Sequence, residues 1–268
     1  MAKGNDGNYL QHSVEVALAL HLASLQPEGR LHIALTHGMA PFEPSDWEAT
    51  GQVRSKLRKA VSAAHASPSA GESSVVAAYR SSGARLSHYP NSAELLRTVL
   101  GTASLTGGIT ERDEKKYLDL QQAWRGTDVE TRQSSWRSEV SMGGILACPR
   151  ALDTPWLFSM DPMSYTERRF ADDAYVYPED GDRLGDVLGG FVKSGQPGVA
   201  ALFVYAVKTH EREKFWAFVD GLSRPLGTTV VYCWLTHRGG NRNLAGLLCA
   251  GFELPDAWVP YGVHAGRC

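Results

Sequence analysis

Residues 156–165 read WLFSMDPMSY, a short apolar run that ends in an acid and a proline. An apolar run of this length, followed by a chain breaker, predicts a buried parallel strand. In an open α/β sheet, ligands bind just beyond the carboxyl ends of such strands, which is where Asp161 stands. Pro162 has no N–H and biases Asp161 toward an extended backbone, so a stiff turn presents the carboxylate. Asp-Pro is also a common way to open a turn, so this stretch alone leaves a functional acid and a purely structural one open.

Helices and buried strands alternate on both sides of this stretch. The apolar segment 13–25 predicts a helix that Ser13 caps, or that begins a few residues earlier. Buried strands are expected, in chain order, at 32–35, 106–110, 198–207 and 228–236. The segment 243–252 predicts a last strand, antiparallel and at the edge. The expected fold class is therefore α/β, a Rossmann-like, mostly parallel sheet with helices on both faces and an antiparallel edge strand.

Two longer segments interrupt this alternation. Residues 45–85 have helical spacing and no strand, which predicts a helical insertion subdomain within a single domain over 1–268. The basic residues at 54–59 either contact an anionic partner or form a solvated helix face. The polar segment 166–187 predicts a mobile loop and the start of a helix, and loops of that length are often lids.

Shorter elements are expected between the helical insertion and residue 156. A helix is predicted over 93–101, with Ser92 as its N-cap and Gly101 at its end. The residues after Glu111 predict another helix, and the surroundings of 138–148 predict a weak strand and a helix.

The composition of the 268 residues is that of an ordinary soluble globular chain, with 43% hydrophobic and 21% charged residues. The formal net charge of −2 lacks the basic balance of a dedicated nucleic-acid binder, so RNA is disfavoured as a partner. No apolar segment is long enough to cross a bilayer, and no signal core precedes the first helix. The four cysteines lack metal-site spacing. We therefore expect a cytoplasmic protein with reduced thiols, no metal and no membrane contact.

Several short motifs, in one order along nearly the whole chain, resemble those of the RlmJ family of ribosomal RNA adenine-N6 methyltransferases. GNDGNYLQH at 4–12 is similar to that family's GNxxDxLKH opening, and LTHG at 35–38 resembles its DTHAGAG cofactor loop. YPNS at 89–92 and TERDEKKY at 110–117 resemble YPGS and TELHPSDY. DPMSY at 161–165 resembles the catalytic DPPY motif. The resemblance implies a methyltransferase fold.

The resemblance also implies roles for particular residues. Gly38 and Glu111 would bind S-adenosylmethionine, Glu111 through the ribose, although Glu111 could equally be an acid that stabilises a helix start. Asp161 would accept a hydrogen bond from the amine under attack and take up its proton. Further substrate-binding candidates from the matched motifs are Asn5, His12, Ser164 and Tyr165.

The departures from the family lie at the cofactor and base sites. Leu35 replaces the acid of the first loop, and Gln11 replaces a lysine that would pair with a cofactor carboxylate. Of the loop glycines only Gly38 is left, so side chains narrow the space for a methionine chain. Met163 replaces the second proline of DPPY, and Ser164 is inserted before the tyrosine. These changes predict that cofactor binding, base recognition or both are lost or rebuilt.

The first functional hypothesis is therefore a small-molecule enzyme on a methyltransferase fold, acting without a methyl donor. An amine of the substrate would attack a carbon of the same molecule and expel sulfate or phosphate, with Asp161 and His37 as catalytic residues. Enzymes that close aziridine rings in azinomycin-type natural-product pathways carry out such a step. Candidate groups for the leaving anion are His37, His237, Arg238 and Arg242, of which the last three otherwise belong to a solvated edge loop.

Two other hypotheses belong to different classes. The second is a true S-adenosylmethionine-dependent N-methyltransferase of RNA or a small amine, with S-adenosylmethionine as the only cofactor implied. The third is an inactive scaffold or binding subunit, because loss of motif residues is typical of a pseudoenzyme. The sequence leaves the substrate, the need for a partner subunit and the oligomeric state open.

Overall fold

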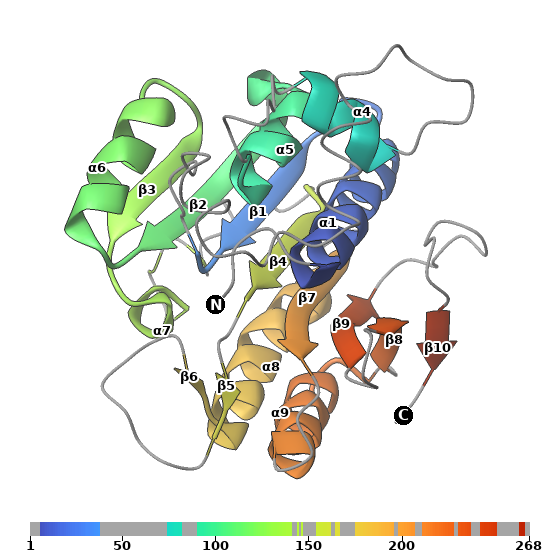
Figure 1. Cartoon of the computed structure of the whole chain (residues 1–268). Coiled ribbons are helices and arrows are strands. Elements are labelled where there is room, and N and C mark those ends of the chain that lie inside the picture. Colours follow the sequence, from blue (N-terminus) through green and yellow to red (C-terminus); the bar gives the residue numbers. More distant parts are fainter. Residues whose placement is uncertain are drawn as a thin grey trace.

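The structure, a computed structural model, describes the following residues: 6–37, 74–81, 90–140, 144, 146, 154–161, 164–166, 175–195, 198–206, 211–227, 230–236, 242–250 and 263–265. Its centre is a sheet with the strand order β3-β2-β1-β4-β7-β9-β8-β10, flanked by helices (Figure 1). The bounds of these strands are β1 Leu31–Leu35, β2 Leu105–Glu111, β3 Val129–Gln133, β4 Trp156–Met160, β7 Val199–Ala206, β8 Val230–Thr236, β9 Arg242–Ala250 and β10 Val263–Ala265.

The pairing of the strands confirms the predicted α/β class. β3, β2, β1, β4 and β7 are parallel to one another, whereas β9 runs antiparallel to both β7 and β8. The strand predicted at 243–252 is therefore β9, and its direction is as expected. Its predicted place at the edge is wrong, because β9 lies between β7 and β8 and the antiparallel edge strand is β10. A nearly continuous apolar run suits a strand that is paired on both sides.

Helices cover both faces of the sheet (Figure 1). Their bounds are α1 Asp6–Ser24, α4 Ser74–Ser81, α5 Ser92–Leu100, α6 Glu114–Ala123, α7 Trp136–Glu139, α8 Pro178–Lys193 and α9 Arg212–Ser223, with a short 3-10 turn, η1, at Thr102–Ser104. α1, α5 and α6 share one hydrophobic core with β1 and β2, and α4 packs against α1 and α5. α7, α8 and α9 share the other core with β4. Within the described residues, every helix is too short or too polar to cross a bilayer.

Strand β4 divides its side chains between the two cores by simple alternation. Trp156, Phe158 and Met160 belong to the core under α8 and α9. Leu157 belongs to the core under α1, and the Ser159 hydroxyl donates a hydrogen bond to a side chain of α1. Asp161, two positions beyond Ser159, therefore follows a residue whose side chain lies on the α1 face of the sheet.

The helix starts differ from the predicted ones in detail. α1 begins at Asp6, so Ser13 is an interior residue and not its cap. The N-cap of α5 is Asn91 rather than Ser92, because the Asn91 side chain accepts from the Glu94 N–H while Glu94 accepts from the Asn91 N–H. This reciprocal capping box satisfies two backbone donors at once. Gly101 ends α5 with a φ of 81°, as predicted.

Other expectations are met in part. Of the predicted insertion at 45–85, the described part is 74–81, and it is helical as α4; the rest lies outside the described residues. The segment 166–187, predicted as a loop and the start of a helix, contains β6 (Tyr175–Val176) and the start of α8, and β6 pairs with β5 (Ser164–Tyr165) just before that segment. The strand and helix expected near 138–148 lie largely outside the described residues, and the described elements before them are β3 and α7.

Gly107 lets β2 lie against β1. Its φ is 118°, and a Cβ there would lie 2.0 Å from the carbonyl oxygen of Ile33, its register partner. We therefore expect Gly107→Ala to lower the free energy of unfolding by about 1–3 kcal/mol, through strain and overpacking. The matched control is Gly101→Ala, where φ is also positive but no atom lies within 4 Å. Urea denaturation measures the free energy of unfolding of both variants. Equal losses would show that the close approach of β2 to β1 does not contribute to the destabilisation.

Candidate active site

The chain reverses its direction of winding across the sheet at β1. From β1 it passes to β2 and β3 on one side, and it then returns to β4 on the other side of β1. The crevice beyond the carboxyl ends of two such strands is the usual ligand site of an open α/β sheet. Leu35 and Ser159 are register partners near the ends of β1 and β4, and the Thr36 N–H donates to the Ser159 carbonyl oxygen at 3.1 Å.

His37 and Asp161 are the residues two positions beyond that last register pair. Both residues therefore follow the carboxyl ends of adjacent parallel strands, at the switch point of the sheet. His37 stands two positions after Leu35, which belongs to the core under α1, and Asp161 stands two positions after Ser159, whose hydroxyl donates to α1. The sequence predicted both residues as catalytic, and that role stays a prediction; the structure places each of them just after one of the two adjacent strands.

Helix α1 places a polar group over this crevice. The Gln11 side-chain nitrogen Nε2 donates to Glu15 Oε1 at 3.3 Å and lies 3.2 Å from Nε2 of His37. The Ser159 hydroxyl donates to the same Glu15 oxygen. Gln11 and Glu15 are 2% and 1% exposed, so this polar contact is made away from water. Gln11 and Glu15 are four residues apart, which puts them on one helix face.

Two carboxyl groups influence each other in this site. Burial, followed by the nearby charge of Glu15, raises the pKa of Asp161 to about 7. Burial also raises the pKa of Glu15, although the hydrogen bonds from Ser159 and Gln11 oppose that shift. The nearby charge of Glu15 therefore couples the titration of Asp161 to that of Glu15. Asp161 is thereby suited to accept a proton at pH 7 and to release it again.

The two histidines of the site are neutral at physiological pH. Burial lowers the pKa of His37 to about 4. Burial and the neighbouring His37 lower the pKa of His12 to about 3. His12 lies on α1, is 2% exposed, and its Nδ1 is 2.7 Å from the Tyr79 hydroxyl of α4. His12 therefore links α1 to α4, while His37 faces the crevice.

Two buried polar atoms of the site lack a hydrogen-bond partner among the described residues. They are Oε2 of Glu15 and Nδ1 of His37. Buried polar atoms in folded proteins are nearly always paired, so a pair of unsatisfied atoms at one place calls for an explanation. A ligand with its own donor and acceptor supplies one. The acids, the neutral imidazole and these two atoms can together hold an amine and take its proton.

Glu111 lies at the carboxyl end of the neighbouring strand β2, as predicted. Its Oε1 accepts from the backbone N–H groups of Arg112 and Asp113 at 2.8 and 2.9 Å. Burial raises its pKa, and these hydrogen bonds and Lys116 oppose the shift. The N-cap of α6 is Asp113, whose side chain accepts from the Lys116 N–H, so Glu111 is not the capping acid. An acid held in this way at the end of the second strand suits a ribose hydroxyl.

The described residues fit only one half of S-adenosylmethionine. Glu111 is placed for its ribose. The amino-acid half carries a carboxylate, and the side chains that reach the crevice from α1 and β1 are Gln11, Glu15 and neutral His37. Within the described cluster the only formal charges are those of acids, which repel a carboxylate. The residues at 38–41, where the cofactor loop would continue, lie outside the described part of the chain.

The other predicted site residues are distributed as follows. Asn5, Gly38, His237 and Arg238 lie outside the described residues. Ser164 and Tyr165 form β5, and only their backbone is described. Arg242 was expected in an edge loop, but it is the first residue of β9 and pairs with Thr236 of β8. The antiparallel pairing of β8 with β9 extends to Arg242, so this residue belongs to a strand and not to the predicted loop.

The sequence analysis missed Glu15 and Ser159 as members of the site. Glu15 is the one acid in the helical stretch 13–25, among residues such as Val14, Val16 and Leu18 that are fully buried. That isolated acid in an apolar run was the available signal, because a buried acid requires partners. Ser159 gave no comparable signal, since a serine inside a strand is common.

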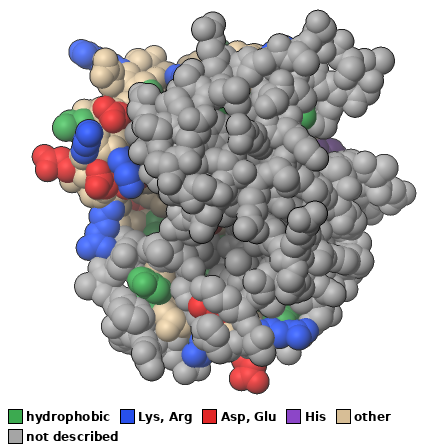
Figure 2. Space-filling model, in the orientation of Figure 1, with side chains coloured by type: hydrophobic (Ala, Val, Ile, Leu, Met, Phe, Trp, Pro, Cys, Tyr) green, Lys and Arg blue, Asp and Glu red, His purple; other side chains and the backbone are tan. Residues whose placement is uncertain are grey.

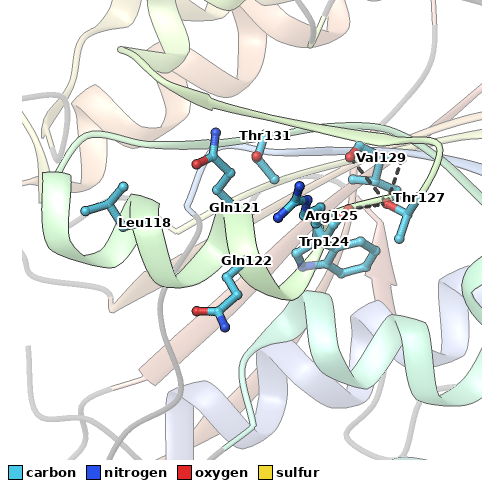
Figure 3. A pocket seen from close by; sticks show the side chains of 9 residues that line it. Leu118, Gln121, Gln122, Trp124, Arg125, Thr127, Val129 and Thr131 are labelled. Carbon is cyan, nitrogen blue, oxygen red and sulfur yellow. Dashed lines mark hydrogen bonds between the residues drawn. The ribbon is translucent and has the colours of Figure 1, made fainter.

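A separate hollow lies between α6 and the edge strand β3 (Figure 3). Its volume is about 510 Å³, and its lining runs from Leu118 of α6 through Trp124, Arg125 and Thr127 to Thr131 of β3. The Thr127 hydroxyl there donates to the carbonyl oxygen of Trp124 at 2.9 Å. The turn in this lining precedes β3, so the hollow lies at the amino end of that strand and is separate from the crevice. Acidic and basic side chains are interspersed over α6, at the left of Figure 2.

Comparison with known proteins supports the fold. No protein-family model matches the sequence, and no curated protein matches it. A crystal structure of the Legionella pneumophila protein LPL1258, of the DUF519 (RlmJ-like) family, superimposes with a TM-score of 0.63 at 14% identity, over 94% of this chain and 87% of that one. A human methyltransferase 10 domain containing protein matches 59% of this chain and 65% of its own at 10% identity, and its TM-score of 0.32 carries no weight. The chain thus shares the Rossmann-like α/β fold of that Legionella pneumophila protein.

Proposed function

We propose that this chain is an enzyme in which Asp161 accepts the proton of an amine that attacks a carbon atom. The observation that carries the proposal is a carboxyl group just beyond the end of β4, at the switch point of the sheet, whose pKa is raised to about 7 by burial and by the nearby charge of Glu15. A general base works best when its pKa lies near the working pH. The fold is one on which substitution at carbon is already expected, because it is methyltransferase-like.

The electrophilic carbon, in this proposal, belongs to the same small molecule as the amine. The amine lone pair forms the N–C bond while the bond from that carbon to a sulfate or phosphate oxygen breaks. The departing anion takes the bonding electrons, and Asp161 takes one N–H proton. Such a step is mainly a matter of alignment, which the neighbouring ends of β1 and β4 can supply. Gln11 and Leu35 stand where the RlmJ-like motifs have a lysine and an acid of the cofactor site, and these departures favour this step over transfer from a methyl donor.

The second candidate is S-adenosylmethionine-dependent methylation of an amine. It is favoured by Glu111, whose carboxylate is held by two backbone N–H groups at the end of β2. Asp161 has the same role toward the amine in this reaction. A third candidate, a binding or scaffold subunit without catalysis, has no such observation in its favour, because an inactive site does not require a base with a pKa near 7.

The experiment uses 2-aminoethyl hydrogen sulfate, which carries an amine and a sulfate leaving group on adjacent carbons. We expect sulfate release, followed by ion chromatography, to be faster with the wild type than with Asp161→Asn. Calorimetry with S-adenosylmethionine is run in parallel on the wild type and Glu111→Ala. Micromolar binding that Glu111→Ala abolishes would replace the first candidate with the second. Release at the uncatalysed rate, together with no binding of S-adenosylmethionine, would favour the scaffold subunit.

The pH dependence of turnover gives a further prediction. Because ionised Asp161 is the base, kcat/KM should rise with pH through about 7, the raised pKa of that group. Glu15→Gln removes the neighbouring charge that helps to raise this pKa, so the rising limb should move to lower pH. The matched control is Glu114→Gln on the exposed start of α6, which should leave the limb in place. A limb that Glu15→Gln leaves unmoved would contradict the pairing of the two acids.

A further inference from the structure

We infer that His37 carries its proton on Nδ1 and donates it to an oxyanion of the ligand, and that Gln11 fixes this tautomer. The ligand would then be a small molecule in which about two carbon atoms separate an amine from a group that carries an oxyanion. This inference deepens the proposed function, since it rests on Asp161 as the group that meets the amine. It assigns His37 to binding and Gln11 to positioning.

The tautomer follows from the hydrogen bonds of Gln11. Its side-chain nitrogen has two N–H groups and no acceptor capacity. One N–H points to Glu15 Oε1 at 3.3 Å, and the same nitrogen lies 3.2 Å from His37 Nε2. Glu15 Oε1 is buried and already accepts from the Ser159 hydroxyl. The Gln11 atom that faces it is therefore the amide nitrogen and not the amide oxygen. His37 Nε2 must then be an acceptor, and a neutral imidazole with an acceptor Nε2 has its proton on Nδ1.

This proton is available to a ligand. Nδ1 of His37 is buried and has no hydrogen-bond partner among the described residues. A buried N–H without an acceptor destabilises the protein, so a ligand that supplies an acceptor removes this cost. Burial lowers the pKa of His37 to about 4, so at neutral pH it acts as a neutral donor and not as a cation.

The charges around the crevice select the kind of acceptor. A bare anion would meet the acids Glu15 and Asp161 and be repelled, whereas His12 and His37 are neutral. A ligand whose ammonium group lies at the acids and whose oxyanion lies at His37 satisfies both sides. Because His37 and Asp161 follow the carboxyl ends of the adjacent strands β1 and β4, we expect a short linker between the two groups of the ligand. A 2-aminoethyl sulfate or sulfonate has that length.

The tautomer can be read in the ligand-free protein by 15N NMR of histidine-labelled samples. We expect His37, assigned by its loss in His37→Asn, to show a protonated Nδ1 and an unprotonated Nε2. Gln11→Leu, which removes the donor at similar size, should shift the balance toward Nε2–H. A wild-type spectrum with the proton on Nε2 overturns the inference, whatever the outcome of the sulfate-release experiment, so the two proposals fail separately.

Binding is tested with taurine, an unreactive 2-aminoethanesulfonate, by NMR titration. His37→Asn keeps an N–H near the position of Nδ1, whereas His37→Gln places its amide nearer the position of Nε2. We expect taurine affinity in His37→Asn to stay within about threefold of the wild type and in His37→Gln to fall by about tenfold, the loss expected from one hydrogen bond to a charged group. Ethylamine, which lacks the oxyanion, should bind all three proteins alike. No taurine binding to the wild type, or equal loss in both variants, overturns the inference.

Discussion

Asp161→Asn should abolish turnover and at the same time make the protein more stable at pH 8. The folded state raises the pKa of Asp161 from its ordinary 3.8 to about 7. Between these two values the folded state binds more protons than the unfolded state, so the free energy of unfolding falls as pH rises through this window. Above pH 7 the folded protein carries the full cost of a buried, repelled carboxylate. Asparagine has a similar shape and no charge, so it removes this cost.

The expected gain at pH 8 is about 2–4 kcal/mol, since each pKa unit corresponds to about 1.4 kcal/mol and the group is partly exposed. The gain should disappear below about pH 4, where the aspartate is protonated in both states. Urea denaturation of wild type and variant at pH 4 and pH 8 measures it. Because His12 and His37 titrate in both proteins, the difference between the two isolates Asp161. The control is Asp119→Asn on the exposed face of α6, which should change little at either pH.

This combination separates a functional acid from a structural one. A structural aspartate at a turn would lose stability when replaced, whereas a base kept at an unfavourable place should lose activity and gain stability. An Asp161→Asn variant that is less stable than the wild type at pH 8 would therefore contradict the account of the site, even if its activity were lost.

Arg137→Met should lower the free energy of unfolding by about 3–5 kcal/mol, the usual cost of leaving one member of a buried ion pair alone. Arg137 makes a forked contact with Asp180, with Nε to Oδ1 at 3.0 Å and Nη2 to Oδ2 at 2.7 Å, and the Asp180 side chain is 4% exposed. Its guanidinium also donates to the carbonyl oxygen of Tyr175 and lies over the rings of Trp136 and Tyr177, at 4.7 and 4.9 Å.

The matched control for this prediction is Arg224→Met. Arg224, which follows α9, pairs with Asp182 of α8 at 3.6 Å, but the two side chains are 73% and 58% exposed. An exposed pair of this kind contributes about 0–1 kcal/mol, so the two arginines should differ by several-fold in their effect. Chemical denaturation of both variants decides this. The double variant Arg137→Met with Asp180→Asn should recover part of the loss, because it leaves no charge unpaired, and its failure to do so would contradict the explanation.

The ion pair has a consequence for the site. Arg137 connects α7 to Tyr175 of β6 and to the start of α8. β6 pairs with β5, and β5 begins three residues after Asp161. Loss of Arg137 should therefore loosen the segment that follows the proposed base.

The sequence predicted those elements whose own residues carry an apolar pattern. β1 and β4 were predicted within one residue of their observed starts, because each is an apolar run that is fully buried. β3 was missed, because it reads VETRQ and only Val129 is buried. Its Arg132 is stabilised by Glu130 at 2.6 Å and by Glu139 at 2.8 Å, so tertiary ion pairs replace the apolar signal.

The candidate site was predictable only where a motif lies on a strand end. His37, Glu111 and Asp161 each follow or end a strand, and the rule for open sheets identifies such positions. Glu15 becomes part of the site only because α1 lies against β4, so that the Ser159 hydroxyl reaches its carboxylate. The periodicity of the sequence does not predict this contact between a strand and a helix that are far apart along the chain. The position of β9 in the sheet likewise depends on which strands it pairs with. Its antiparallel direction alone does not predict that position.

The most direct test of the account is the pKa of the Asp161 carboxyl, measured by 13C NMR on aspartate-labelled protein with Asp161→Asn for assignment. The account predicts a value of about 7, and a lower value in Glu15→Gln, because the charge of Glu15 contributes to the shift. A value near 3.8 in the wild type would contradict it, since an acid with its ordinary pKa is neither desolvated nor paired with Glu15 and is no better a base than any surface aspartate.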